Sequence, residues 1–162
     1  MLGFIVGYLF AAFVGCWGTS LIVNEMWRCV GWEGPEDIEL RPITWKWQPV
    51  LVGILERVLY IASLQSGYGE FIGVWLLVKI AARWSKWDKP VGSLNRQRRL
   101  EGYHIYQIFL IGNALSISFA AIGFLQINLV SEGKIVELVA ASILPVLGVL
   151  CITVWLRRFR LQ

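Results

Sequence analysis

The chain has 162 residues and a formal net charge of +4 at pH 7. Hydrophobic residues make up 57% of it, charged residues only 16%, and the mean hydropathy is +0.61. This balance excludes an ordinary soluble domain, and several apolar runs approach the roughly 17 to 25 residues that a membrane helix needs. We therefore expect an all-α, polytopic integral membrane protein forming one membrane-embedded helical domain over residues 1–162.

The first apolar run, Leu2 to Val23, contains no charged residue and predicts a span over about residues 2–23. Within it, Gly3, Gly7, Ala11 and Gly15 recur at intervals of four. Small residues at this spacing lie on one helix face and allow a second helix to approach closely. The partner helix belongs either to the same chain or to a second copy, and the sequence leaves both open.

The next apolar segment, residues 49–84, is too long for one ordinary span and is interrupted by Ser66-Gly67-Tyr68-Gly69, a turn signal. We expect a hairpin of two short helices, at about 49–66 and 69–84. One crossing in place of two is the alternative, and the chain then has four spans.

Two further runs predict spans at about 103–125 and 135–156. The first carries His104 near its start, and the second contains Pro145. Proline is tolerated inside a membrane helix when neighbouring groups satisfy the freed carbonyl, so Pro145 predicts a kink and not a boundary. Together these segments make five spans.

The basic residues favour five spans with the N-terminus outside and the C-terminus cytoplasmic, because Lys and Arg accumulate in cytoplasmic loops. This topology collects nearly all of them on one side and leaves only Lys134 outside. Most of the nine tryptophans then lie near the cytoplasmic face, where their amphipathic rings favour the interface. We expect a multi-pass protein of the cell (plasma or inner) membrane.

Glu56 and Lys79 are equidistant from the centre of the predicted hairpin turn. At 1.5 Å per residue both lie roughly 17 Å from it, at the same depth on neighbouring helices. An unpaired charge inside the bilayer costs at least about 2.5 kcal/mol, so we predict an interhelical ion pair between them.

Other polar residues follow the same faces. Tyr60 and Ser63 share a helix face with Glu56, whereas Asn113 and Ser116 lie on the next span. The candidate intramembrane polar cluster comprises Glu56, Arg57, Lys79, Asn113, Tyr60, Ser63 and Ser116. Either these residues line a functional pathway, or they only hold the helices together.

The basic stretch around residues 83–99 predicts contact with anionic lipid headgroups. The residues assigned to this contact are Arg83, Lys86, Arg96, Arg98 and Arg99. A patch this short does not favour nucleic acid as a partner.

Motifs for stronger chemistry are missing from the sequence: it has no phosphate loop, dinucleotide fingerprint or zinc-protease motif. Its cysteines, Cys16, Cys29 and Cys151, lack metal-ligand spacing. We therefore expect no metal, no cofactor and no catalytic residue, and the sequence does not favour an enzyme.

The leading functional hypothesis is a small multi-pass membrane protein, assembled as a homo-oligomer or within a larger membrane complex, whose charged cluster lines a pathway or gate for a small ion or proton. The alternative is a structural or adaptor subunit of a larger complex. A third hypothesis is an intramembrane enzyme that acts on lipid, with Glu56 as a general base.

Overall fold

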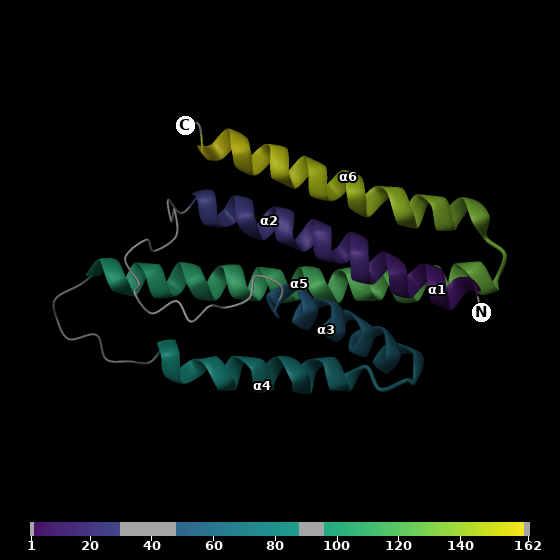
Figure 1. The fold of residues 1–162 in the computed structure, drawn as a ribbon, viewed down its shortest axis with the longest axis horizontal. Helices are drawn as coiled ribbons and strands as arrows, with labels where there is room; N and C mark the ends of the chain where they lie inside the picture. Colours follow the sequence, from purple (N-terminus) through teal and green to yellow (C-terminus); the bar gives the residue numbers. More distant parts are fainter. Residues whose placement is uncertain (1, 30–47, 88–95, 161–162) are drawn as a thin grey trace.

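The computed structural model describes residues 2–29, 48–87 and 96–160, and every element within these ranges is helical (Figure 1). The elements are α1 (Leu2–Leu9), η1 (Phe10–Val14), α2 (Gly15–Cys29), α3 (Gln48–Gln65), α4 (Glu70–Trp87), α5 (Arg96–Ser131) and α6 (Ile135–Arg160). The segments α1, η1 and α2 form one continuous rod with a π-helical segment near its middle. The expected all-α fold is confirmed for the described residues.

Three helices are long and apolar enough to cross a membrane: Leu2–Cys29, Tyr106–Ser131 and Ile135–Phe159. They correspond to the first, fourth and fifth of the expected spans. The helices α3 and α4 have 18 residues each, which makes each about 27 Å long. Their crossing of the bilayer stays a prediction, and so does the total of five spans.

The predicted hairpin between α3 and α4 is present. The turn depends on Gly67, whose φ of 77° is a left-handed conformation that glycine adopts without steric strain. The amide of Tyr68 donates to the carbonyl of Ser63 (2.9 Å) and so closes the end of α3. The hairpin therefore folds α4 back alongside α3.

Several helices extend beyond the spans predicted from the sequence, two of them into polar segments. The first helix continues past Val23 to Cys29, and α5 begins at Arg96, seven residues before the predicted start at Tyr103. Both extensions are rich in polar residues, which end an apolar run but still form helix. Pro145 lies inside α6, as predicted.

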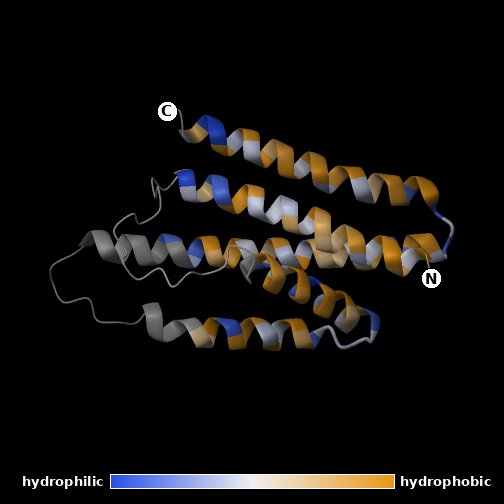
Figure 2. Ribbon diagram, viewed as in Figure 1, coloured by the Kyte–Doolittle hydropathy of each residue, from blue (hydrophilic) through white to orange (hydrophobic). Residues whose placement is uncertain are grey.

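The rod formed by α1, η1 and α2 lies between α5 and α6, while the α3–α4 hairpin packs on the other side of α5 (Figure 1). The ends of α2 and α6 near the C-terminus are hydrophilic, and most of the length of α6 is hydrophobic (Figure 2). The polar ends of these two helices therefore meet at the same end of the bundle.

The small-residue face of the first helix packs against α5 of the same chain. A Cβ added to Gly7 would lie 2.3 Å from the carbonyl oxygen of Gly123, which shows that the two backbones are in contact there. Gly3 meets Val130 and the carbonyl of Ile127, and Ala11 is 1% exposed. The structure thus selects the intrachain alternative for this face.

We expect Gly7→Ala to destabilise the bundle by about 1–3 kcal/mol, because the added methyl group has no space between two backbones. Gly148→Ala is the matched control: this α6 glycine has no atom within 4 Å of an added Cβ, so the change is neutral or stabilising by up to about 1 kcal/mol. Thermal unfolding in detergent measures both. Equal midpoints for the two variants would contradict the close approach of α1 and α5.

Candidate functional site

The predicted ion pair between Glu56 and Lys79 is present. The Lys79 Nζ lies 2.7 Å from Glu56 Oε1 and 2.9 Å from Oε2. Glu56 is buried on α3, and Lys79 reaches it from α4. The equal distances of the two residues from the Gly67 turn place them side by side, as the sequence predicts.

Asn113 on α5 completes this cluster. The Lys79 Nζ donates a hydrogen bond to Asn113 Oδ1, and Asn113 Nδ2 donates to the carbonyl of Phe109 (2.7 Å). The ammonium also lies 5.5 Å from the centre of the Phe109 ring, within the range of a cation–π interaction. Glu56, Lys79 and Asn113, called the charged triad below, therefore connect α3, α4 and α5.

Arg57 points from α3 toward α2 and is 2% exposed. Its Nη2 donates to Thr19 Oγ1 (3.0 Å), and the Cys16 thiol lies beside the guanidinium. The Nε and Nη1 atoms are buried and have no hydrogen-bond partner among the described residues. Arg57 is thus a buried cation that is only partly satisfied.

Two glycines make room for this guanidinium. A Cβ on Gly15 of α2 would lie 3.0 Å from Arg57 Nε, and a Cβ on Gly53 of α3 would lie 3.5 Å from Nη1. Larger side chains at Gly15 would push the arginine out of its position. The helix-packing face of the first helix therefore also positions a charged side chain.

The charged triad and Arg57 line a cavity of about 820 Å³ between α2, α3, α4 and α5. Thr19, Ser20, Asn24 and Ser116 supply further polar groups. The rest of its described lining is formed by Cys16, Val23, Trp27, Val50, Val52, Gly53, Ile108, Phe109 and Gly112. Among the described lining residues, two cations, Arg57 and Lys79, face one carboxylate, Glu56. This space is called the polar cavity below.

The cavity ends one helical turn beyond Arg57. Tyr60 and Ile61 are fully buried there and pack with Ala11, Ala120 and Ile127 into a core cluster. None of these five residues lines the cavity. The polar cavity is therefore closed toward the hairpin turn.

The structure brings together Glu56, Arg57, Lys79, Asn113 and Ser116 of the predicted cluster. Tyr60 belongs to the core cluster, and the Ser63 hydroxyl donates to the carbonyl of Tyr68 in the hairpin turn. Tyr60 and Ser63 lie on the same face of α3 as Glu56. Nearer the hairpin turn, this face no longer lines the cavity and is packed against other residues. The side chains of the proposed lipid-contacting residues, Arg83, Lys86, Arg96, Arg98 and Arg99, lie outside the described part of the structure.

One charged cluster, with a buried carboxylate and two exposed arginines, escaped the sequence analysis. Glu25 on α2 is 3% exposed and accepts hydrogen bonds from Arg157 Nε on α6 and from Arg28 Nη1, both at 3.0 Å. The apolar run that predicts the first span ends at Val23, so Glu25 lies outside the predicted span. Arg157 at the end of the last span was the signal in the sequence that could have indicated an acidic partner near the end of the first span.

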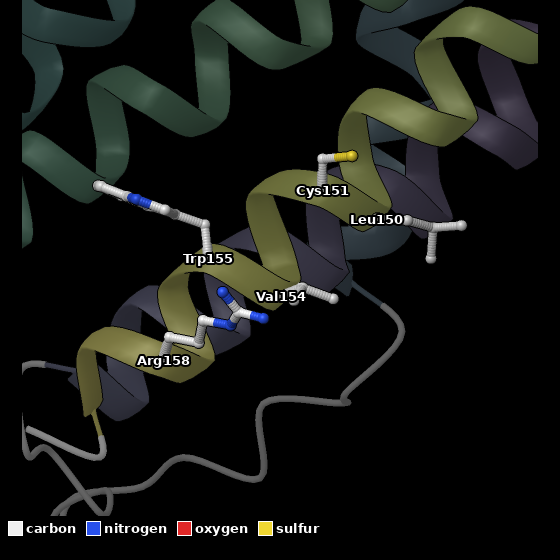
Figure 3. A pocket seen from close by; sticks show the side chains of 5 residues that line it. All are labelled: Leu150, Cys151, Val154, Trp155 and Arg158. Atoms are coloured by element: carbon white, nitrogen blue, oxygen red, sulfur yellow. The ribbon is translucent and has the colours of Figure 1, made fainter.

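A second hollow, of about 360 Å³, lies on α6 (Figure 3). Its five lining residues, Leu150, Cys151, Val154, Trp155 and Arg158, all come from this one helix. Leu150, Val154 and Trp155 are exposed hydrophobic residues of a candidate membrane span. This hollow is therefore an exposed and largely apolar surface of one helix, and it lacks the set of charged side chains that lines the polar cavity.

No protein-family model, curated protein or solved structure matches this chain. The described residues also contain no group of three or more His, Cys, Asp or Glu side chains that could hold a metal ion. The polar cavity is therefore the basis for the proposed function of this protein.

We expect Lys79→Met to destabilise the protein by about 3–5 kcal/mol, because it leaves the Glu56 carboxylate buried without its partner. Combining it with Glu56→Gln should restore part of this loss, since the uncompensated charge is then removed. The measurement is the thermal midpoint of the purified protein for both single variants and the double variant.

The matched control is Lys134→Met, which removes a half-exposed lysine paired with Glu132 outside the spans. Such a surface pair contributes about 0–1 kcal/mol. If the effects of Lys79→Met and Glu56→Gln simply add in the double variant, the pair does not interact as its geometry implies.

Proposed function

We propose that this protein is a multi-pass membrane protein in which the polar cavity is the entrance of a pathway for a small ion or proton, and the charged triad is its gate. The observation that carries the proposal is the joint lining of one cavity by Glu56, Lys79 and Arg57, which come from two helices of the hairpin. Intramembrane ionisable side chains that face a cavity mark ion or proton pathways more often than they mark simple packing.

The closed end of the cavity supports the proposal that the charged triad acts as a gate. Beyond Arg57, Tyr60 and Ile61 on α3 pack directly against Ala120 on α5, so a pathway would need these helices to separate. The triad ties α4 to both of them through Lys79. Breaking the Lys79 contacts would therefore free the hairpin to move relative to α5.

The topology proposed with this function has five spans, with α3 and α4 as two short crossings. Arg28, Arg157 and Arg158 lie at the end of the bundle where α2 and α6 finish, whereas Lys134 lies in the turn at the opposite end. The positive-inside rule then makes the arginine end cytoplasmic, with the C-terminus there and the N-terminus outside. The cell membrane is the proposed location.

An oligomer is part of this proposal. One chain encloses its cavity with four helices and closes it with its own core, so a continuous pathway would require either hairpin movement or a second copy. The alternative of a structural subunit is favoured by one observation: Lys79 is satisfied by Glu56 and Asn113, as a purely structural cation would be. The proposed lipid contacts of the basic residues 83–99 are compatible with both functions.

Measurement of ion and proton flux through the purified protein in proteoliposomes tests this proposal. In proteoliposomes, we expect the wild-type protein to conduct ions or protons, and Glu56→Gln to raise the flux by at least about tenfold, because the neutral side chain no longer holds the gating lysine and the hairpin is freed from α5. Glu70→Gln is the control, since Glu70 is exposed at the start of α4.

Both variants must be compared at matched incorporation and with the same oligomeric state as the wild type. Absence of flux from stable wild-type protein would reject the pathway. Loss of folded protein in Glu56→Gln, recovered in the double variant with Lys79→Met, would instead support the structural role.

A further inference from the structure

We infer that Arg57 is an anion-binding residue and that the polar cavity holds the phosphate group of a ligand, either a lipid headgroup or free phosphate. This inference rests on the proposed function in that it assigns a ligand to the same cavity. It does not require that the ligand be transported.

The unsatisfied donors of Arg57 are the first argument. Arg57 is 2% exposed, yet its described partners are the Thr19 hydroxyl and the adjacent Cys16 thiol, which is a weak acceptor. The Nε and Nη1 atoms have no acceptor among residues 2–29, 48–87 and 96–160. Buried donors of this kind are rare in native proteins, and an oxyanion in the cavity would satisfy them.

Gly53 brings one of these buried donors next to the lining of the polar cavity. Gly53 lines the polar cavity and lies against Arg57 Nη1, where a Cβ would come within 3.5 Å. Nη1 itself is buried in this structure, so a ligand oxygen would reach it through a shift of the Arg57 side chain, and glycine at position 53 places no side chain in the way.

The charge of the cavity is the second argument. Lys79 is neutralised by Glu56 at 2.7 Å, whereas no carboxylate of the described residues forms an ion pair with Arg57 within 4 Å. Glu56 is next to Arg57 in the chain, but both of its oxygens bind Lys79. Among the described residues, one positive charge in the cavity is thus left for an anion, and burying it without one is costly.

The lining of the cavity favours a phosphate group over a bare halide. Thr19, Ser20, Asn24 and Ser116 line the same cavity as the cations and carry hydroxyl or amide groups, and tetrahedral phosphate offers acceptors in several directions. A volume of about 820 Å³ is in the range of cavities that hold organic ligands.

The apolar part of the lining fits a ligand with a hydrophobic portion. Val50 and Val52 of α3 line the cavity and are 41% and 51% exposed, on a surface we assign to lipid. Asn113 is seven residues from Tyr106, the start of the α5 span, so the charged triad lies about 10 Å inside that boundary. A phospholipid headgroup needs to move only this far to reach Arg57.

The test is native mass spectrometry of the delipidated full-length protein, with Kd values from calorimetry. The probes are inorganic phosphate, short-chain phosphatidic acid and the matching diacylglycerol, which lacks the phosphate. We expect the wild-type protein to bind at least one phosphate-bearing probe and not diacylglycerol. Binding of inorganic phosphate and its competition with phosphatidic acid would indicate a free-phosphate site, and binding of phosphatidic acid alone would indicate a lipid headgroup.

Two variants link the binding to Arg57. We expect Arg57→Met to weaken the binding of the phosphate-bearing probe by at least about tenfold, and Arg57→Lys to restore it only in part, because lysine keeps the charge but not the planar set of donors. Because Arg57→Met could fail to fold, Gly112→Met is the second variant. Gly112 lines the cavity, and a Cβ there meets only Val23 at an ordinary 3.6 Å, so the longer side chain fills the cavity while Arg57 is unchanged.

The outcomes separate this inference from the proposed pathway. Phosphate binding that is lost in Gly112→Met, without ion flux in proteoliposomes, would support the Arg57 site and reject the pathway. Ion flux without binding of either phosphate-bearing probe would reject the Arg57 site and keep the pathway. Equal binding of diacylglycerol, or unchanged phosphate affinity in folded Arg57→Met, would also overturn the inference.

Discussion

A charge inside an apolar bundle needs a partner, and this requirement determines how the α3–α4 hairpin joins the other helices. Glu56, Lys79 and Asn113 each come from a different helix, and each satisfies part of the hydrogen-bonding demand of the next. The hairpin is held to α5 by this triad together with the packing of Tyr60 and Ile61. Removing one charge therefore affects the arrangement of three helices at once.

The close packing of the first helix and the position of Arg57 are parts of the same arrangement. Gly7 allows the backbone of α1 to contact that of α5, and eight residues later Gly15 leaves space for both Phe119 and the Arg57 guanidinium. Small residues in membrane helices usually serve helix association alone. Here the same face of small residues packs the first helix against α5 near the N-terminus and makes room for the Arg57 guanidinium beside the cavity.

The two charged clusters of the bundle differ in a way that bears on function. The Glu25 carboxylate does not line the polar cavity, and it meets two exposed arginines near the polar ends of α2 and α6, where its pair with Arg157 joins the two helices. Arg57 has the opposite balance, because it has buried donors without acceptors among the described residues and lies beside a cavity. The Glu25 cluster is explained by packing alone, whereas packing of the described residues leaves donors of Arg57 unused, which is the basis of the proposed anion site.

The sequence by itself determined the helical membrane class, the hairpin at Gly67 and the pairing of Glu56 with Lys79, because hydrophobic length, turn residues and distance from a turn are local properties. It also indicated the packing face of Gly3, Gly7, Ala11 and Gly15. Only the tertiary structure decided that this face packs on α5, that Arg57 and Asn113 share a cavity with the ion pair, and that Tyr60 and Ser63 do not. These outcomes depend on the rotation of each helix about its axis, which is set by contacts between segments far apart in the chain, such as Gly7 with Gly123 and Arg57 with Thr19.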